Sequence, residues 1–246
     1  MKGSTLTSSA IIAVVLLLVP VSGPASDEQR GDSQGKQPAS VAAPKYNFPI
    51  RGAPGTRLGG GTRGIPQEFT LAVLAPDHTG LTVQERPSLY WYLSKSTPYP
   101  LVFTLIDVGA EKSILEVRLT PPAQAGVQRI RLADYGVVLK RGVQYQWFVA
   151  LALDPDHRSS DIIAGGVIER VDPSKELSSQ MAQAKGVDAL WMYAEAGIWY
   201  DAVASISELI DGAPSERSLR QQRALLLNQV GLPEIAAYDL RDGASR

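Results

Sequence analysis

Residues 190–206 read LWMYAEAGIWYDAVASI, and residues 224–240 read ALLLNQVGLPEIAAYDL. The two stretches repeat a pattern of apolar and small residues at a spacing of 34, which pairs Gly197 with Gly231. A period of 34 residues is that of the tetratricopeptide repeat, in which two antiparallel helices cross closely at small residues. The spacing therefore predicts paired helices in the last third of the chain, in a class of repeat that binds proteins rather than transforming substrates.

Helical periodicity extends outward from the repeat over residues 174–246. Ser174 is expected to cap a first helix, and Pro233 fits the first turn of the last one. The other helices are expected at about residues 187–196, 199–210, 216–230 and 233–240. The sequence thus predicts a helical segment that resembles tetratricopeptide repeats.

Fewer than three such repeats rarely form a stable solenoid alone, so these helices need another surface to pack on. That surface could be the region that precedes them, a second copy of the chain or another repeat protein. The candidate partner-binding residues are Tyr193, Trp199, Tyr200 and Leu227. In the alternative interpretation the helices only cap the preceding region, and these side chains are then core.

Residues 68–172 carry short apolar alternations separated by turn residues. Alternation with a period of two is typical of strands with one buried face. Seven strands are expected, at about residues 69–73, 89–93, 101–108, 115–119, 129–132, 143–151 and 162–171. The predicted fold class is therefore an immunoglobulin- or fibronectin-like antiparallel β-sandwich followed by the helical segment.

Aromatic residues sharpen this prediction. Tyr145 follows the turn residue Gly142 at the start of a late strand, where its hydroxyl can bond the preceding backbone as in a tyrosine corner. Trp91 is expected to fill the core from a facing strand. Tyr90 and Tyr92 point the other way, where they either form a sugar-stacking platform or lie buried under a neighbouring loop or helix.

The first 25 residues have the features of a secretory signal peptide: Lys2, an apolar run over 10–19, and small residues up to Ala25. The run is too short to cross ~30 Å of hydrocarbon. The mature chain is therefore expected to be secreted across the inner membrane, periplasmic or extracellular, and not membrane-spanning. Residues 26–67 are rich in Gly, Pro and Ser and are interpreted as a leader.

Composition narrows the function classes. The chain has 24 basic and 25 acidic residues, so nothing in its charge indicates nucleic-acid binding. It has no cysteine, which excludes disulfides, thiolate metal sites and cysteine nucleophiles. It has two histidines, His78 and His157, and no Gly-x-Ser-x-Gly elbow. The prediction is a non-enzymatic protein with no catalytic residue, cofactor or metal assigned.

Two segments could nevertheless bind a ligand. The glycine-rich stretch 51–64 lacks the Lys-Ser/Thr ending of a phosphate-binding loop, so close backbone approach to the sandwich edge is the preferred interpretation. The second segment is an expected turn, named here the loop of unknown role, whose residues are Asp154, Asp156, His157, Arg158 and Asp161. Its carboxylates could hold Ca²⁺ or serve an unrecognised enzyme, but the EF-hand spacing fails at Arg158, and an Arg158–Asp161 ion pair is simpler.

Several stretches carry a family resemblance when taken in order. They are 51–55 (RGAPG), 60–64 (GGTRG), 81–83 (LTV), 85–87 (ERP), 90–92 (YWY), 145–147 (YQW), 158–161 (RSSD), 168–171 (IERV) and 193–202 (YAEAGIWYDA). The set resembles the bacterial family named domain of unknown function 928, known mainly from cyanobacteria. The resemblance implies export and a two-part layout, and it brings no assigned activity. It also implies a cysteine pair in relatives, where this chain has Ile65 or Pro66 and Leu153.

Together these features predict a secreted, envelope-associated adaptor whose partner is another protein. The alternative is a carbohydrate or envelope-polymer binding module that uses strand-face aromatics and the arginines of the glycine-rich stretch.

Overall fold

The computed structural model describes residues 43–49, 70–154 and 160–242, all within one compact unit, Ser40–Arg246. The expected signal peptide and the glycine-rich stretch lie outside the described residues. So do Ile65, Pro66 and three residues of the loop of unknown role, which are Asp156, His157 and Arg158.

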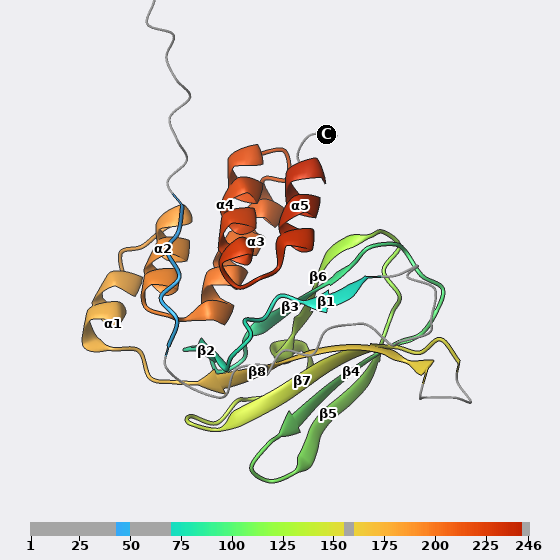
Figure 1. The fold of residues 1–246 in the computed structure, drawn as a ribbon. Coiled ribbons are helices and arrows are strands. Elements are labelled where there is room, and N and C mark those ends of the chain that lie inside the picture. The colour runs from blue at the N-terminus through green and yellow to red at the C-terminus, as the bar shows by residue number, and fades with distance from the viewer. Residues whose placement is uncertain (1–42, 50–69, 155–159, 243–246) are drawn as a thin grey trace, which may run out of the picture. The chain divides into compact units, whose positions relative to one another are not determined.

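The described part of the chain contains eight strands, a short 3₁₀ helix and then five α-helices (Figure 1). The strands are β1 (Leu71–Val73), β2 (Gly80–Thr82), β3 (Ser88–Leu93), β4 (Leu101–Asp107), β5 (Lys112–Leu119), β6 (Gly126–Arg131), β7 (Gln144–Leu151) and β8 (Ile162–Arg170), and the 3₁₀ helix η1 is Leu132–Tyr135. The coarse prediction of strands followed by helices is thus confirmed.

The strands form two sheets. One has the order β1-β3-β6 and is antiparallel, and the other has the order β2-β8-β7-β4-β5. In the second sheet β2 runs parallel to β8, so the prediction of seven strands, all antiparallel, is wrong on both points. The sequence did not reveal β2 because it has only three residues, all buried, and therefore shows no alternation.

The aromatic side chains expected in the core are there. Trp91 is 3% exposed and belongs to one apolar cluster that takes side chains from both sheets and from the helices. The Tyr145 hydroxyl accepts a hydrogen bond from the Lys140 N–H at 3.1 Å, across a turn in which Gly142 has a φ of 68°. The expected bond from this tyrosine to the preceding backbone is therefore confirmed.

Tyr90 and Tyr92 point away from Trp91 but do not face solvent. They are 3% and 5% exposed, and the Tyr92 ring meets the edge of the Tyr238 ring at 5.1 Å. Since Tyr238 belongs to the last helix, strand β3 is covered on this face by the helical part of the chain. Of the two expectations for these tyrosines, burial beneath a helix is confirmed.

The helices are α1 (Lys175–Met181), α2 (Val187–Glu195), α3 (Trp199–Gly212), α4 (Arg217–Gln229) and α5 (Pro233–Asp242). Ser174 caps the first one, because its hydroxyl accepts a hydrogen bond from the Leu177 N–H at 3.0 Å. Helix α2 packs beside α3, and α4 packs beside α5, so the helical part contains two hairpins. Among the described residues, no helix is both long and apolar enough to cross a membrane.

A buried ion pair ties the second hairpin together and joins it to the first. Arg223 on α4 donates from Nε and Nη2 to the two carboxylate oxygens of Asp239 on α5, at 2.7 and 2.6 Å. Its Nη1 donates to the Ser207 hydroxyl on α3 at 3.1 Å. Both charged side chains are almost fully buried, which makes this pair a fixed part of the helical core.

Candidate functional site

Three of the four candidate partner-binding residues are core residues. Trp199, Tyr200 and Leu227 are at most 2% exposed, so the expectation that they meet a partner is corrected. Trp199 Nε1 donates to the Leu74 carbonyl at 2.8 Å. The Tyr200 hydroxyl accepts from Trp147 Nε1 at 2.9 Å and donates to a β8 carbonyl at 3.0 Å. These side chains attach the helices to the sheets.

A segment far away in the sequence covers part of the helices instead. Residues 43–49, named here the strap, run beside α2 and are drawn in blue in Figure 1. Pro44 and Tyr46 are buried, whereas Lys45 and Asn47 are exposed. This alternation is that of an extended chain with one face against the helices.

The helices hold the strap mainly by its backbone. The Gln229 side chain accepts a hydrogen bond from the Tyr46 N–H at 2.9 Å and donates another to the Pro44 carbonyl at 2.5 Å. The Ala194 carbonyl accepts from the Asn47 N–H at 3.1 Å. The Asn47 side-chain amide donates to the Glu195 carbonyl at 2.6 Å. One glutamine side chain thus bonds both an N–H donor and a carbonyl acceptor of the same extended main chain.

Gly197 allows this close approach. A Cβ atom at that position would lie 2.8 Å from the Asn47 carbonyl oxygen, closer than real Cβ contacts come. Its φ of 74° is also a conformation that L side chains rarely adopt. Gly197 therefore has two roles: it ends α2, and it leaves room for the strap.

Tyr46 anchors the strap through its side chain. Its ring meets the edge of the Trp199 ring at 4.9 Å, and its hydroxyl lies 2.9 Å from His78 Nε2. Burial raises the pKa of the Tyr46 phenol and lowers the pKa of the His78 imidazole, the latter against an opposing effect of Asp77. Both groups are thus favoured in their neutral forms, which suits donation from the hydroxyl to the imidazole nitrogen.

The hold on the strap rests on two buried side chains and on five hydrogen bonds to the helices and His78. Together these contacts must exceed the cost of ordering seven residues, roughly 1–2 kcal/mol each.

Sequence patterns placed this segment within the leader 26–67. The apolar alternation is too short to raise the hydrophobicity of a Gly-, Pro- and Ser-rich stretch. The one local signal is the pair Tyr46 and Phe48, two aromatics in a region that otherwise has none.

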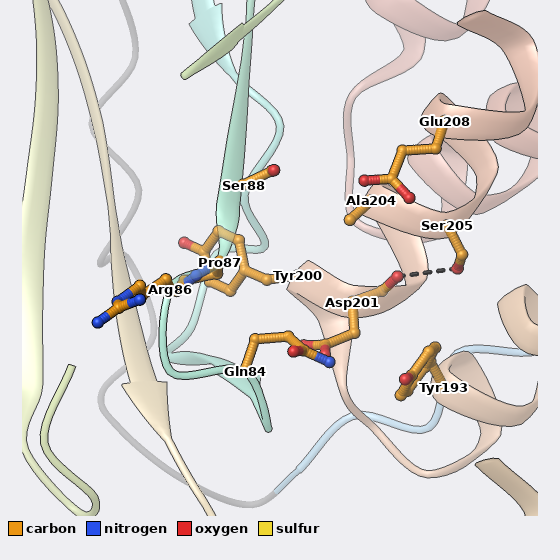
Figure 2. A pocket seen from close by; sticks show the side chains of 10 residues that line it. All are labelled: Gln84, Arg86, Pro87, Ser88, Tyr193, Tyr200, Asp201, Ala204, Ser205 and Glu208. Atoms are coloured by element: carbon orange, nitrogen blue, oxygen red, sulfur yellow. Dashed lines mark hydrogen bonds between the residues drawn. The ribbon is translucent and has the colours of Figure 1, made fainter. Parts of the chain in front are cut away.

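Tyr193, the fourth candidate, is partly buried and lines a cleft of about 310 Å³ beside α3 (Figure 2). The lining residues are Gln84, Arg86, Pro87, Ser88, Tyr193, Tyr200, Asp201, Ala204, Ser205 and Glu208. The Ser205 hydroxyl, a possible nucleophile, donates to the Asp201 backbone carbonyl at 2.9 Å. None of the described residues that line the cleft is a histidine, the usual base for such a nucleophile.

Asp201 is the chemically distinctive group of the cleft. Burial raises its pKa to about 6, and the nearby polar groups of Thr82, Gln84 and Val83 offset this only in part. Its Oδ2 accepts a hydrogen bond from the Val83 N–H at 3.3 Å, which ties α3 to the end of β2. The carboxyl thus serves as a link between helix and sheet.

Only the two ends of the loop of unknown role are described. Asp154 is partly exposed and Asp161 is 4% exposed, and both have interaction partners. Among the described residues, no three His, Asp or Glu side chains lie close enough to hold a metal ion. The ion pair and the calcium site suggested for this loop involve residues that the structure does not describe.

The family model of the Domain of Unknown Function (DUF928) matches residues 58–240. The chain belongs to this family. No curated protein matches this DUF928 chain. Among solved structures, the crystal structure of a multi-domain immunophilin from Arabidopsis thaliana aligns at 8% identity over 81% of this chain and 100% of that one. Its TM-score of 0.18 is too low to carry an argument about the fold.

Proposed function

We propose that this protein is an exported, non-enzymatic adaptor that binds another protein of the cell envelope through its helices. The observation that carries the proposal is the hold of Gln229 and Ala194 on the main chain of the strap. Backbone N–H and carbonyl groups are present in every extended polypeptide. Helices that bind such groups are suited to hold a segment of a partner.

The finer fold assignment belongs to the same proposal. The spacing of 34 between Gly197 and Gly231 supports a tetratricopeptide-like relation between the two hairpins. The bond from Lys140 N–H to the Tyr145 hydroxyl supports an immunoglobulin- or fibronectin-like sandwich. The parallel pairing of β2 with β8 is a departure from such a sandwich.

Export is proposed from the signal-peptide features of residues 1–25. An exported chain would act in the periplasm or outside the cell.

Binding of a glycan or envelope polymer is the alternative function. Its expected platform, Tyr90 and Tyr92, is buried under the helices. The glycine-rich stretch that would assist it lies outside the described residues. Because no specific observation favours glycan binding, protein binding is preferred.

Site-specific photo-crosslinking in the producing cells tests the proposal. A photoreactive residue at exposed Glu195 on α2 or Asn228 on α4 should yield the same crosslinked protein. Ile114 on β5, which is 42% exposed and far from the helices in sequence, is the control position. The adaptor proposal fails if no product forms at the helix positions, or if the product at Ile114 is the same.

A further inference from the structure

The strap is bound in the way that a separate peptide would be bound. Its hydrogen bonds join residues between 32 and 185 positions apart, with His78, Glu195 and Gln229 as the distant partners. None of these bonds depends on the strap being part of the same chain. A segment of another chain could make each of them.

We infer that the surface formed by Ala194, Glu195, Gly197, Trp199, Gln229 and His78 is a docking site for an extended partner segment of the pattern Pro-x-Tyr-Asn. The chain's own strap occupies this surface, named here the strap site, and competes with the partner. The inference rests on the adaptor function proposed above and adds to it the chemistry of the partner and a form of self-inhibition.

The pattern follows from what each strap residue contacts. Pro44 is buried and its carbonyl accepts from Gln229. Lys45 is exposed, so any residue fits at that place. Tyr46 is 2% exposed and presents a hydroxyl to His78, which favours tyrosine over phenylalanine. The Asn47 amide donates to the Glu195 carbonyl, which favours a side-chain amide. Phe48 is 55% exposed and adds little selectivity.

The surface also accommodates the main chain of the strap. Gly197 leaves the space in which the Asn47 carbonyl lies, and a larger residue would close it. Among the residues of the strap site, Gln229 alone has a side chain that both donates to and accepts from the strap backbone. Main-chain hydrogen bonds of this kind supply affinity for an extended peptide, and the side-chain contacts of Tyr46 and Asn47 supply selectivity.

Because the strap already occupies the strap site, a partner must displace it in order to bind. A tethered segment acts at an effective concentration in about the millimolar range. A partner must therefore bind tightly or carry further contacts to displace the strap. In a chain whose strap is weakened, the same site should become available to a short peptide.

A labelled peptide of sequence APKYNFP, identical to residues 43–49, is the probe. The full mature chain with Tyr46→Ala should bind it at least tenfold more tightly than the unaltered chain does, because its own strap no longer competes. Adding Gln229→Ala to Tyr46→Ala should weaken the binding at least tenfold. A probe with Ala in place of Tyr should not bind. Equal binding by the unaltered and Tyr46→Ala chains, or no binding by a folded Tyr46→Ala chain, would overturn the inference.

A second measurement keeps the test decisive if Tyr46→Ala fails to fold. The chain has no cysteine, so Lys45→Cys gives a single labelling position on an exposed strap residue. The unlabelled peptide at concentrations above the millimolar range should release the strap and raise the mobility of a spin label there. Unchanged mobility would contradict the inference. A concentration-dependent dimer that disappears in Tyr46→Ala would show that the occupant is a second copy, which also overturns the assignment to a partner.

Failure of this inference differs from failure of the adaptor proposal. Peptide binding without an envelope protein crosslinked at Glu195 or Asn228 would leave the strap site intact and remove the adaptor role. A crosslinked partner without peptide binding would keep the adaptor role and place its contact elsewhere on the helices.

Discussion

Gly197 and Gly231, 34 positions apart, end the first helix of each hairpin in the same backbone conformation, with φ of 74° and 72°. The residue after each glycine donates its N–H to a carbonyl five residues earlier: Ile198 to Tyr193 at 2.8 Å, and Leu232 to Leu227 at 3.1 Å. This is the hydrogen bond of a Schellman cap. The sequence repeat is therefore also a repeat of local structure.

Gly197→Ala should cost more stability than Gly136→Ala. Both glycines have positive φ, 74° and 67°, so alanine is strained by about 1–2 kcal/mol at either place. A Cβ at Gly136 meets nothing within 4 Å, whereas a Cβ at Gly197 would meet the Asn47 carbonyl of the strap at 2.8 Å. Urea unfolding of the two variants measures the difference. Equal losses would mean that the strap does not pack against Gly197.

Breaking the buried pair of Arg223 and Asp239 should be strongly destabilising. Asp239→Ala leaves a buried guanidinium without its carboxylate, which typically costs about 3–5 kcal/mol. The matched control is the exposed pair of Arg141 and Asp172, where Asp172→Ala should cost less than about 1 kcal/mol. Denaturant titration of both variants checks the contrast. A small loss for Asp239→Ala would indicate that the helical core does not depend on this pair.

Asp201→Asn should stabilise the protein at neutral pH. Burial raises the pKa of Asp201 to about 6 from an ordinary 3.8. Between these two pH values the folded chain retains a proton that the unfolded chain has lost. Stability therefore falls as pH rises from about 4 to about 6, by up to about 3 kcal/mol. Asparagine avoids this loss and still accepts from the Val83 N–H.

The measurement is the free energy of unfolding of Asp201→Asn and of the unaltered chain at pH 4 and pH 7.5. The gain should appear at pH 7.5 and largely vanish at pH 4. Glu116→Gln, on an exposed position of β5, is the control and should change stability by less than about 0.5 kcal/mol at both pH values. A loss of stability at pH 7.5 would mean that the ionised carboxylate is better satisfied than its burial suggests.

Tyr200→Phe should weaken the attachment of the helices to the sheets. The change removes one hydroxyl and leaves Trp147 Nε1 and the Val167 carbonyl without the partner they have here. Each buried group left in this way costs about 1–3 kcal/mol. Tyr135→Phe, at a 38% exposed tyrosine, is the control. Similar thermal stability of the two variants would contradict the role given to the Tyr200 hydroxyl.

Local sequence patterns predicted the positions of the helices well, but they did not predict which helix side chains are buried. The period of 3.6, the cap at Ser174 and the glycines at 197 and 231 are short-range signals, and the helices lie close to where these signals put them. Burial of Trp199 and Leu227 depends on tertiary packing, because an apolar stripe on a helix looks the same whether a sheet or a partner covers it.

The strap shows the limit of such patterns most clearly. Its helix contacts involve partners at least 147 positions away, and its own sequence is dominated by leader-like composition. Strand β2 was missed for a related reason, since its pairing with β8 joins Gly80 to Ile168. Contacts of this range are not encoded in any local period.

Amide hydrogen exchange at Asn47, whose N–H bonds the Ala194 carbonyl, tests the central claim most directly. If the strap is a releasable ligand of the helices, this amide should exchange at least 100-fold faster than the buried Val149 amide of β7, and Gln229→Ala should speed it further without affecting β7. Protection equal to that of Val149, unchanged by Gln229→Ala, would show that the strap is a fixed part of the core.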